Sequence, residues 1–455
     1  MAISITQSPN QIQRVGGKQI WICTSTNVAN AGFKFLVTID VDSVEVYKGY
    51  HDPNPVGRLI FDARKVLEAL IETDTRTHTG AIIHKPTGFF ARYTNGIKAY
   101  TINFGEVYID AGVLTEFADL TTATRTVTQG WYDGREGMTT AGYYMYPYAN
   151  DTQTPQGKFP FLTSRVWNYL ISTATNIYYN QGVNVVNPEL SALTSNVGET
   201  IPVIDVTTAD DGVLVMSNFP EDVVGAVQFP ATHVRFVYYN GTTVLATYDY
   251  ELNATNGTRT PNATEVDGRY AIIAAYPNNT LAGLGIILNP TWTSYTVQPY
   301  NTAQNLPAGQ YVRFRKVTRP CKSDMRRIAW ANRFGGYDYF WFEGATEFTL
   351  DSERKTYRKI RGNYGGASVT VSNYDTEREN YYNDVKRGYT IRHGGVTKEE
   401  RIMLESLFTS KHVWIYENDS WLPCNLTGNN YTRMGKMSKY FTVQFTVTLG
   451  YDANA

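Results

Sequence analysis

Hydrophobic and polar residues alternate in short runs along most of the chain, and this pattern predicts β-strands. The clearest run is near the end, where threonine and glutamine separate Phe441, Val443, Phe445, Val447 and Leu449. Successive side chains of a strand point to opposite faces. One face of this strand is therefore predicted to be buried, and the other to meet water or a partner.

The first 130 residues combine such runs with one helical pattern. Residues 33–39 and 43–47 are predicted to pair as a hairpin, and 99–104 to form a further strand. Before that strand, Asp62 is placed to cap a helix whose apolar face consists of Val66, Leu67, Leu70 and Ile71. We predict a β-sandwich with one packed helix over residues 1–130.

Residues 131–224 give no comparable pattern. Tyrosines crowd around Pro147, a residue that does not fit a central strand. Ser164 is placed to cap a short helix, and Asp210, Asp211 and Gly212 indicate a turn. We predict an irregular, tyrosine-rich region here.

Residues 225–318 contain the strongest hairpin signal. Asn240 and Gly241 separate two alternating runs, 234–239 and 243–248, and an Asn-Gly pair favours the positive φ angles of a tight hairpin. Further short runs follow at 270–274, 285–288, 294–297 and 311–314. This spacing predicts a second β-sandwich.

Residues 319–455 are predicted to form a separate α+β or β assembly domain. Thr397 and Glu400 have the spacing of a capping box. The helix that they begin has an apolar stripe of Met403, Leu404, Leu407 and Phe408, and strands at 413–416 and 421–424 follow. The whole chain is thus predicted to be mostly β, with several sandwich-like domains and a few short helices.

The composition favours extensive contact surfaces. The chain has 34 Tyr and 20 Phe but only 18% charged residues, and tyrosine is enriched where proteins meet. The formal net charge of −1 gives no general attraction to nucleic acid or membranes. Residues 312–361, however, carry 13 Lys/Arg and 6 Asp/Glu, a net of +7 that leaves −8 for the remainder. This segment is a solvated basic stretch, or it faces an acidic subunit or DNA in a channel.

No pattern of catalytic, metal-binding or cofactor-binding residues occurs. The six histidines lack zinc-site spacing, and neither a nucleophile elbow nor a phosphate-binding glycine loop is present. Cys23 and Cys424 lie in apolar surroundings and are predicted to be core residues. We therefore expect a protein that is not an enzyme and has no cofactor or metal. No apolar run approaches the ~18 residues of a membrane span.

The segment 326–342 stands out because a basic run leads through Gly335-Gly336 into an almost wholly aromatic run. Two interpretations are open: an aromatic hairpin in a core, or a loop that presents Tyr and Arg to another subunit. The candidate interface residues here and just beyond are Arg326, Arg327, Trp330, Arg333, Tyr337, Tyr339, Trp341, Arg354, Tyr357 and Arg358.

Residues 327–340 and 352–358, together with the helix and strands that end the chain, resemble structural tail proteins of tailed bacteriophages. The resemblance covers about 312–455, with a weaker similarity in the N-terminal sandwich. It implies a virion protein, assembled in the bacterial host cytoplasm, that forms a ring in the tail, the baseplate or the head–tail junction. Its partners would be copies of itself and other virion proteins.

Two alternatives come from other functional classes. The 225–318 sandwich is a candidate carbohydrate-binding or receptor-binding module at the tail tip, which would present Trp292, Tyr295 and Tyr300 to a host-surface glycan. A capsule-degrading enzyme is the other alternative, but no pair of carboxylates can be assigned to it.

Overall fold

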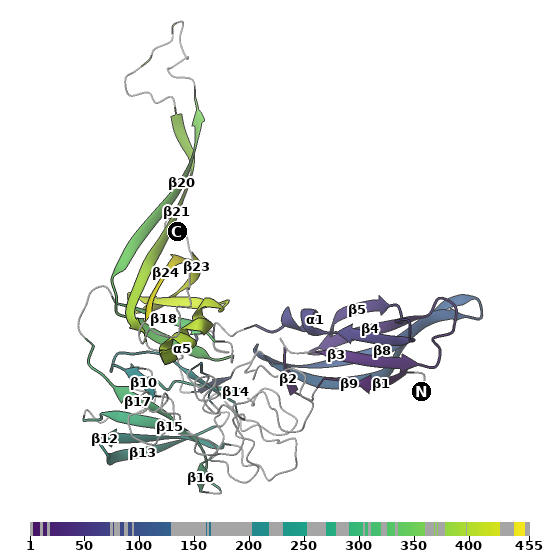
Figure 1. Ribbon diagram of the computed structural model, residues 1–455, viewed down its shortest axis with the longest axis horizontal. Helices are drawn as coiled ribbons and strands as arrows, with labels where there is room; N and C mark the ends of the chain where they lie inside the picture. Colours follow the sequence, from purple (N-terminus) through teal and green to yellow (C-terminus); the bar gives the residue numbers. More distant parts are fainter. Residues whose placement is uncertain are drawn as a thin grey trace. The chain divides into compact units, whose positions relative to one another are not determined.

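The protein is described here from a computed structural model (Figure 1). The described residues are 3–9, 12–15, 19–72, 76, 82–85, 90–92, 95–128, 161, 163–164, 203–217, 231–252, 270–278, 291–303, 305–307, 311–319, 325–332, 335–359, 368, 371, 378–396, 398–427 and 441–450. Their fold is mostly β, as predicted, with five sheets and two short helices.

The chain divides into two compact units. Unit 1 contains residues 1–320 together with 331–338 and 402–409, and unit 2 contains 321–330, 339–401 and 410–455. Of the middle region, the tyrosines around Pro147 and the helix predicted after Ser164 lie outside the described residues, and so does the run 285–288.

The N-terminal part of unit 1 consists of two sheets that share one hydrophobic core. The smaller sheet has the order β1 (Ile3–Gln7), β3 (Ile20–Ser25), β6 (Arg58–Asp62). The larger has the order β2 (Ile12–Arg14), β9 (Val113–Thr128), β8 (Ile97–Asp110), β4 (Lys34–Val41), β5 (Val44–His51). The β4–β5 hairpin confirms the pairing predicted for 33–39 and 43–47.

Aromatic packing fills this core. Trp21 is fully buried, and its ring centroid lies 5.7 Å from that of Phe104 on the opposite sheet. Helix α1 (Arg64–Glu68) adds Leu67 to the core. Asp62 accepts a hydrogen bond from the Arg64 amide at 3.0 Å, although the residue directly before the helix is Ala63.

A second pair of sheets occupies the middle of the chain. The larger has the order β10 (Val203–Val206), β17 (Val312–Lys316), β15 (Ser294–Asn301), β12 (His233–Asn240), β13 (Thr243–Glu251), and β16 (Leu306–Pro307) also pairs with β15. The smaller has the order β11 (Leu214–Ser217), β14 (Tyr270–Ile273), β7 (Phe90–Arg92). Strands β7, β10 and β11 therefore join these sheets from outside the range 225–318.

The β12–β13 hairpin turns at Asn240-Gly241, as predicted, and Gly241 has a φ of +57°. Tyr295 lies on β15, the strand that pairs with β12 of this hairpin, and its side chain is fully buried. Its ring stacks on Phe314 at 4.8 Å, and its buried hydroxyl donates a hydrogen bond of 2.7 Å to the carbonyl of Ala275.

The C-terminal sheet has seven strands. Their order is β19 (Tyr337–Phe342), β18 (Arg326–Ala331), β22 (Val413–Glu417), β23 (Ser420–Thr427), β24 (Phe441–Leu449), β21 (Arg378–Val396), β20 (Thr346–Arg358). In β24 the side chains of Val443, Phe445, Val447 and Leu449 are buried, while Thr442 and Gln444 are exposed, which confirms the predicted alternation.

Helix α5 (Lys398–Phe408) confirms the predicted helix, and Met403, Leu404 and Leu407 of its apolar stripe are buried. Thr397, the first residue of the proposed capping box, lies outside the described residues.

The Tyr295 hydroxyl gives a test of the middle core. Tyr295→Phe leaves the buried Ala275 carbonyl without this donor, so the free energy of unfolding should fall by about 1–2 kcal/mol in urea denaturation. Tyr248→Phe, on the neighbouring hairpin and half-buried, is the control and should change it by less than about 0.5 kcal/mol. Equal effects of the two substitutions would contradict this role of the hydroxyl.

Candidate assembly surface

The aromatic segment singled out in the sequence forms the β18–β19 hairpin. Its turn is closed by hydrogen bonds from the Asn332 amide to the Gly336 carbonyl (2.8 Å) and from the Gly335 amide to the Asn332 carbonyl (3.1 Å). Gly335 has a φ of +88°, a conformation that glycine adopts without steric cost. The Gly335-Gly336 turn predicted from sequence is therefore present.

Most of the candidate interface residues in this hairpin are core residues. Arg327, Trp330, Tyr337 and Tyr339 are all buried. The Arg327 guanidinium lies 5.1 Å from the ring centroid of Tyr339 and 5.3 Å from that of Trp421. A buried cation packed against aromatic rings is a stabilising arrangement. Of the two interpretations, an aromatic hairpin in a core therefore fits these four residues. Because they are buried, they cannot contact another subunit.

The remaining candidates fall into three groups. Arg326 and Trp341 are half-buried, and the Arg326 guanidinium lies 5.0 Å from the Tyr389 ring centroid. Arg333 lies outside the described residues. Only Arg354, Tyr357 and Arg358 are exposed, and all three belong to β20.

Strands β20 and β21 form a ribbon that extends beyond the rest of their sheet (Figure 1). The two strands pair with each other from Thr346–Ile391 to Arg358–Arg378, whereas β24 pairs with β21 only from Gly388 onward. Within the described part of the chain, 350–358 and 378–387 have no other strand beside them. We call this two-stranded part, with Phe348 at its base, the ribbon.

One face of the ribbon is rich in arginine and has exposed apolar residues. Directly opposed residues of an antiparallel pair share a face, so the registers Leu350–Arg387, Ser352–Val385 and Arg358–Arg378 define it. This arginine face consists of Phe348, Leu350, Arg354, Arg358, Arg378, Val385 and Arg387. No carboxylate lies on it among the described side chains.

The arginine face continues the core face of the sheet. Tyr389 and Ile391, on the same side of β21, are buried opposite Val447 and Phe445 of β24. Past Gly388 no strand pairs with β21 on that side in the described chain, and the apolar residues become exposed: Phe348 is 57% exposed and Leu350 is 59% exposed. A face that is core at one end is therefore open at the other.

The opposite face carries charges of both signs, and several of them are paired. Tyr357 donates a hydrogen bond of 2.7 Å to Glu379, and Lys359 also binds this carboxylate. These hydrogen bonds, that of Lys359 first, lower the pKa of Glu379. Arg392 binds Glu347 at 2.6 Å. On the arginine face, by contrast, Arg354 and Arg387 have no carboxylate partner among the described residues.

Four residues of the arginine face were not predicted from the sequence: Phe348, Leu350, Arg378 and Arg387. The signal for the first two was present, because every second residue of 346–358 belongs to one face, and that face contains Phe, Leu and two Arg. Arg378 and Arg387 come onto the same face only through the β20–β21 register, which the sequence does not show.

The candidate glycan-binding residues are core residues. Trp292, Tyr295 and Tyr300 are all buried, and the Arg235 guanidinium covers the Tyr300 ring at 3.4 Å from its centroid. A sugar stacks on an exposed aromatic face, and none of these three residues provides one.

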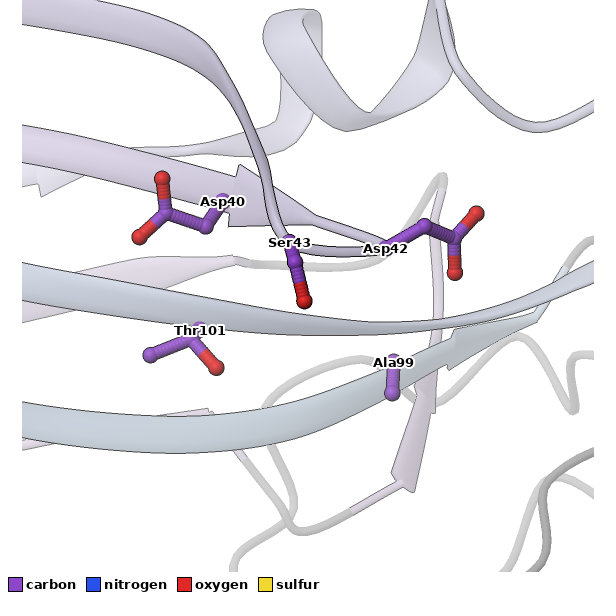
Figure 2. Close-up of a pocket in the computed structure, with 5 residues that line it drawn as sticks. All are labelled: Asp40, Asp42, Ser43, Ala99 and Thr101. Carbon is purple, nitrogen blue, oxygen red and sulfur yellow. The ribbon is translucent and has the colours of Figure 1, made fainter.

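The described residues also contain no arrangement of side chains that we can assign to catalysis. A shallow hollow of about 530 Å³ is lined by Asp40, Asp42, Ser43, Ala99 and Thr101. Figure 2 shows the two carboxylates pointing away from each other, and Asn103 (2.9 Å) and Lys98 (2.9 Å) bind one each. Among the described residues, no three His, Cys, Asp or Glu side chains are grouped to hold a metal.

Burial raises the pKa of the Cys23 and Cys424 thiols to about 12, which makes both poor nucleophiles.

Comparisons with known proteins assign no family. No protein-family model matches the chain, and no curated protein matches it. Among solved structures, the full extracellular region of plexin A4 aligns with 98% of this chain at 8% identity and a TM-score of 0.18. The chain covers 31% of that plexin, and a likeness at this TM-score carries no argument. No helix in the described parts is long and apolar enough to cross a bilayer.

Arg327 and Arg354 form a matched pair for testing burial. Arg327→Ala removes a buried guanidinium and its stem from beside aromatic rings, so the free energy of unfolding should fall by about 2–4 kcal/mol. Arg354→Ala, on the exposed ribbon, should change it by less than about 0.5 kcal/mol. Urea denaturation followed by tryptophan fluorescence measures both. A harmless Arg327→Ala would show that this arginine is not part of the core.

Proposed function

We propose that this chain is a structural protein of a tailed-bacteriophage virion, where it assembles with copies of itself and with other virion proteins in the tail, the baseplate or the head–tail junction. The observation that carries the proposal is the exposed arginine face of the ribbon. The class of particle comes from the sequence resemblance over 312–455, and the site of assembly is the bacterial host cytoplasm.

The ribbon has the physical character of an unfilled contact. Burying an exposed large apolar side chain contributes about 1.5–3 kcal/mol, so Phe348 and Leu350 together favour a covering partner. Arginine is among the residues that dominate interface energies, and the arginine face has four of them. A strand rises about 3.3 Å per residue, so 350–358 reach roughly 30 Å, enough to touch a neighbouring subunit.

The opposite face of the ribbon, which carries charges of both signs, also supports a role of the arginine face in assembly. On this face Lys355, Lys359 and Arg392 each pair with a carboxylate of the same face, so these cations need no external counter-charge. The arginine face needs one, and an acidic protein surface or DNA in a channel would supply it. Exposed apolar residues at its base favour a protein, because phosphate oxygens and sugars offer Phe348 and Leu350 little apolar surface.

Neither alternative class has a comparable observation behind it. The burial of Trp292, Tyr295 and Tyr300 leaves the carbohydrate-binding module without its proposed residues. For capsule degradation, Asp40 and Asp42 are held by Asn103 and Lys98 and point apart (Figure 2).

Assembly through the arginine face should depend on salt. The mass of the purified chain in light scattering should exceed the monomer mass at about 0.1 M NaCl and fall towards it at about 1 M, because the Debye length shortens from about 10 Å to about 3 Å. The double variant R354A/R387A should assemble more weakly at the lower salt. K355A/K386A, which changes the opposite face of the same two strands, is the control.

A monomer at every concentration and salt, with or without other virion proteins, would overturn the proposed function. An oligomer whose mass changes neither with salt nor with the arginine substitutions would show that the ribbon is not the assembly contact.

A further inference from the structure

We propose that the partner of the arginine face is the tip of the β8–β9 hairpin of a second copy of this chain. This inference rests on the proposed function and names the two surfaces through which the copies meet.

The tip of the β8–β9 hairpin is a second projecting ribbon. Strand β4 pairs with β8 only as far as Val107, and the Ile109 amide then donates a hydrogen bond of 2.9 Å to the Ala31 carbonyl. Beyond Ile109, β8 pairs with β9 alone in the described chain. Ala111 and Gly112 form the two-residue turn, with φ values of 48° and 83°. Ile109 lies opposite Leu114, and Asp110 lies opposite Val113. We call residues 108–115 the tip.

Apolar side chains are exposed at the tip as they are on the arginine face. Val113 and Leu114 are each 65% exposed, and Ile109 is 46% exposed. Ile109 and Leu114 share one face of the tip, and Val113 lies beside Asp110 on the other, so both faces offer apolar surface to Phe348 and Leu350. Burying the two groups against each other would remove both from water.

The charges of the two surfaces are opposite. Residues 99–124 contain four acidic residues and no Lys, Arg or His. Glu106 is buried and is bound by Ser25 and Asn27, while Glu116 is bound by Lys48 and Tyr50. Asp110 is exposed at the tip itself and has no partner among the described residues. The carboxylate available at the tip thus complements Arg354 and Arg387.

A contact between two different surfaces of one chain is heterologous. Each copy then offers one tip and one arginine face, so copies link head to tail, and the chain of contacts closes into a ring when the rotation between copies permits. Arginine supplies geometrically specific contacts to carboxylates, and the apolar residues supply the buried area.

Charge reversal in two separate full-length chains tests this pairing. One chain carries R354D/R387D and the other carries D110K, and all three positions are exposed. Each chain alone should associate about tenfold to a hundredfold more weakly than the unmodified protein, because like charges then meet at the contact. An equimolar mixture should recover assembly, since the reversed tip meets the reversed face and the two native surfaces also meet.

Matched controls keep the result specific. K355D/K386D reverses the charges of the opposite ribbon face, and Glu68→Lys reverses an exposed carboxylate of α1; both should assemble like the unmodified chain. Thermal unfolding of every variant checks that the fold is retained. Binding of a short DNA duplex is measured in parallel for the unmodified and the R354D/R387D chains.

The outcomes separate the two proposals. Loss in each variant and recovery in the mixture supports the pairing. An unmodified chain that assembles while D110K has no effect, or a mixture that does not recover, overturns the pairing and leaves the proposed function standing. Strong DNA binding that R354D/R387D abolishes, with assembly unchanged, assigns the arginine face to DNA and also overturns the pairing. A chain that never assembles overturns both.

Discussion

The packing of aromatic side chains on the inward faces of sheets is the interaction on which all described parts of this protein depend. Trp21, Tyr295 and Trp330 are fully buried, one in each group of sheets. Large flat side chains at alternate positions bury much apolar area on a pleated surface, and edge-to-face and stacked contacts add to it. The same alternation sends the intervening polar side chains to the other face. Fold and surface are therefore two results of one pattern.

That dependence explains which predictions succeeded. Strand β24, the β4–β5 hairpin and the β12–β13 hairpin follow from local alternation and from turn residues such as Asn240 and Gly241, so sequence alone located them. Burial of Trp292 and Tyr295 could not be deduced in this way. An aromatic residue in a strand looks the same whether its face meets a second sheet or solvent, and the answer depends on pairing between distant segments.

The candidate site also separates what local sequence predicts from what depends on pairing between distant strands. Arg327 and Arg354 are both arginines in a basic stretch with aromatic residues nearby, and their sequence surroundings predict the same role for both. The structure buries Arg327 beside the rings of Tyr339 and Trp421 and leaves Arg354 exposed. The distinction comes from the position of each strand in the sheet: β18 lies between β19 and β22, whereas β20 is an outer strand. Strand order is a long-range property, and short sequence patterns do not encode it.

The outer position of β20 also has a consequence for the chain before it meets any partner. Along its free edge, backbone amides and carbonyls have no neighbouring strand in the described structure, and such edges recruit other strands without selectivity. Five of the eight residues from Asp351 to Arg358 in β20 are charged. Pairing this edge with the edge strand of another chain would cost the free energy of desolvating these side chains. The charged residues of β20 thus discourage aggregation of newly made chains through this edge.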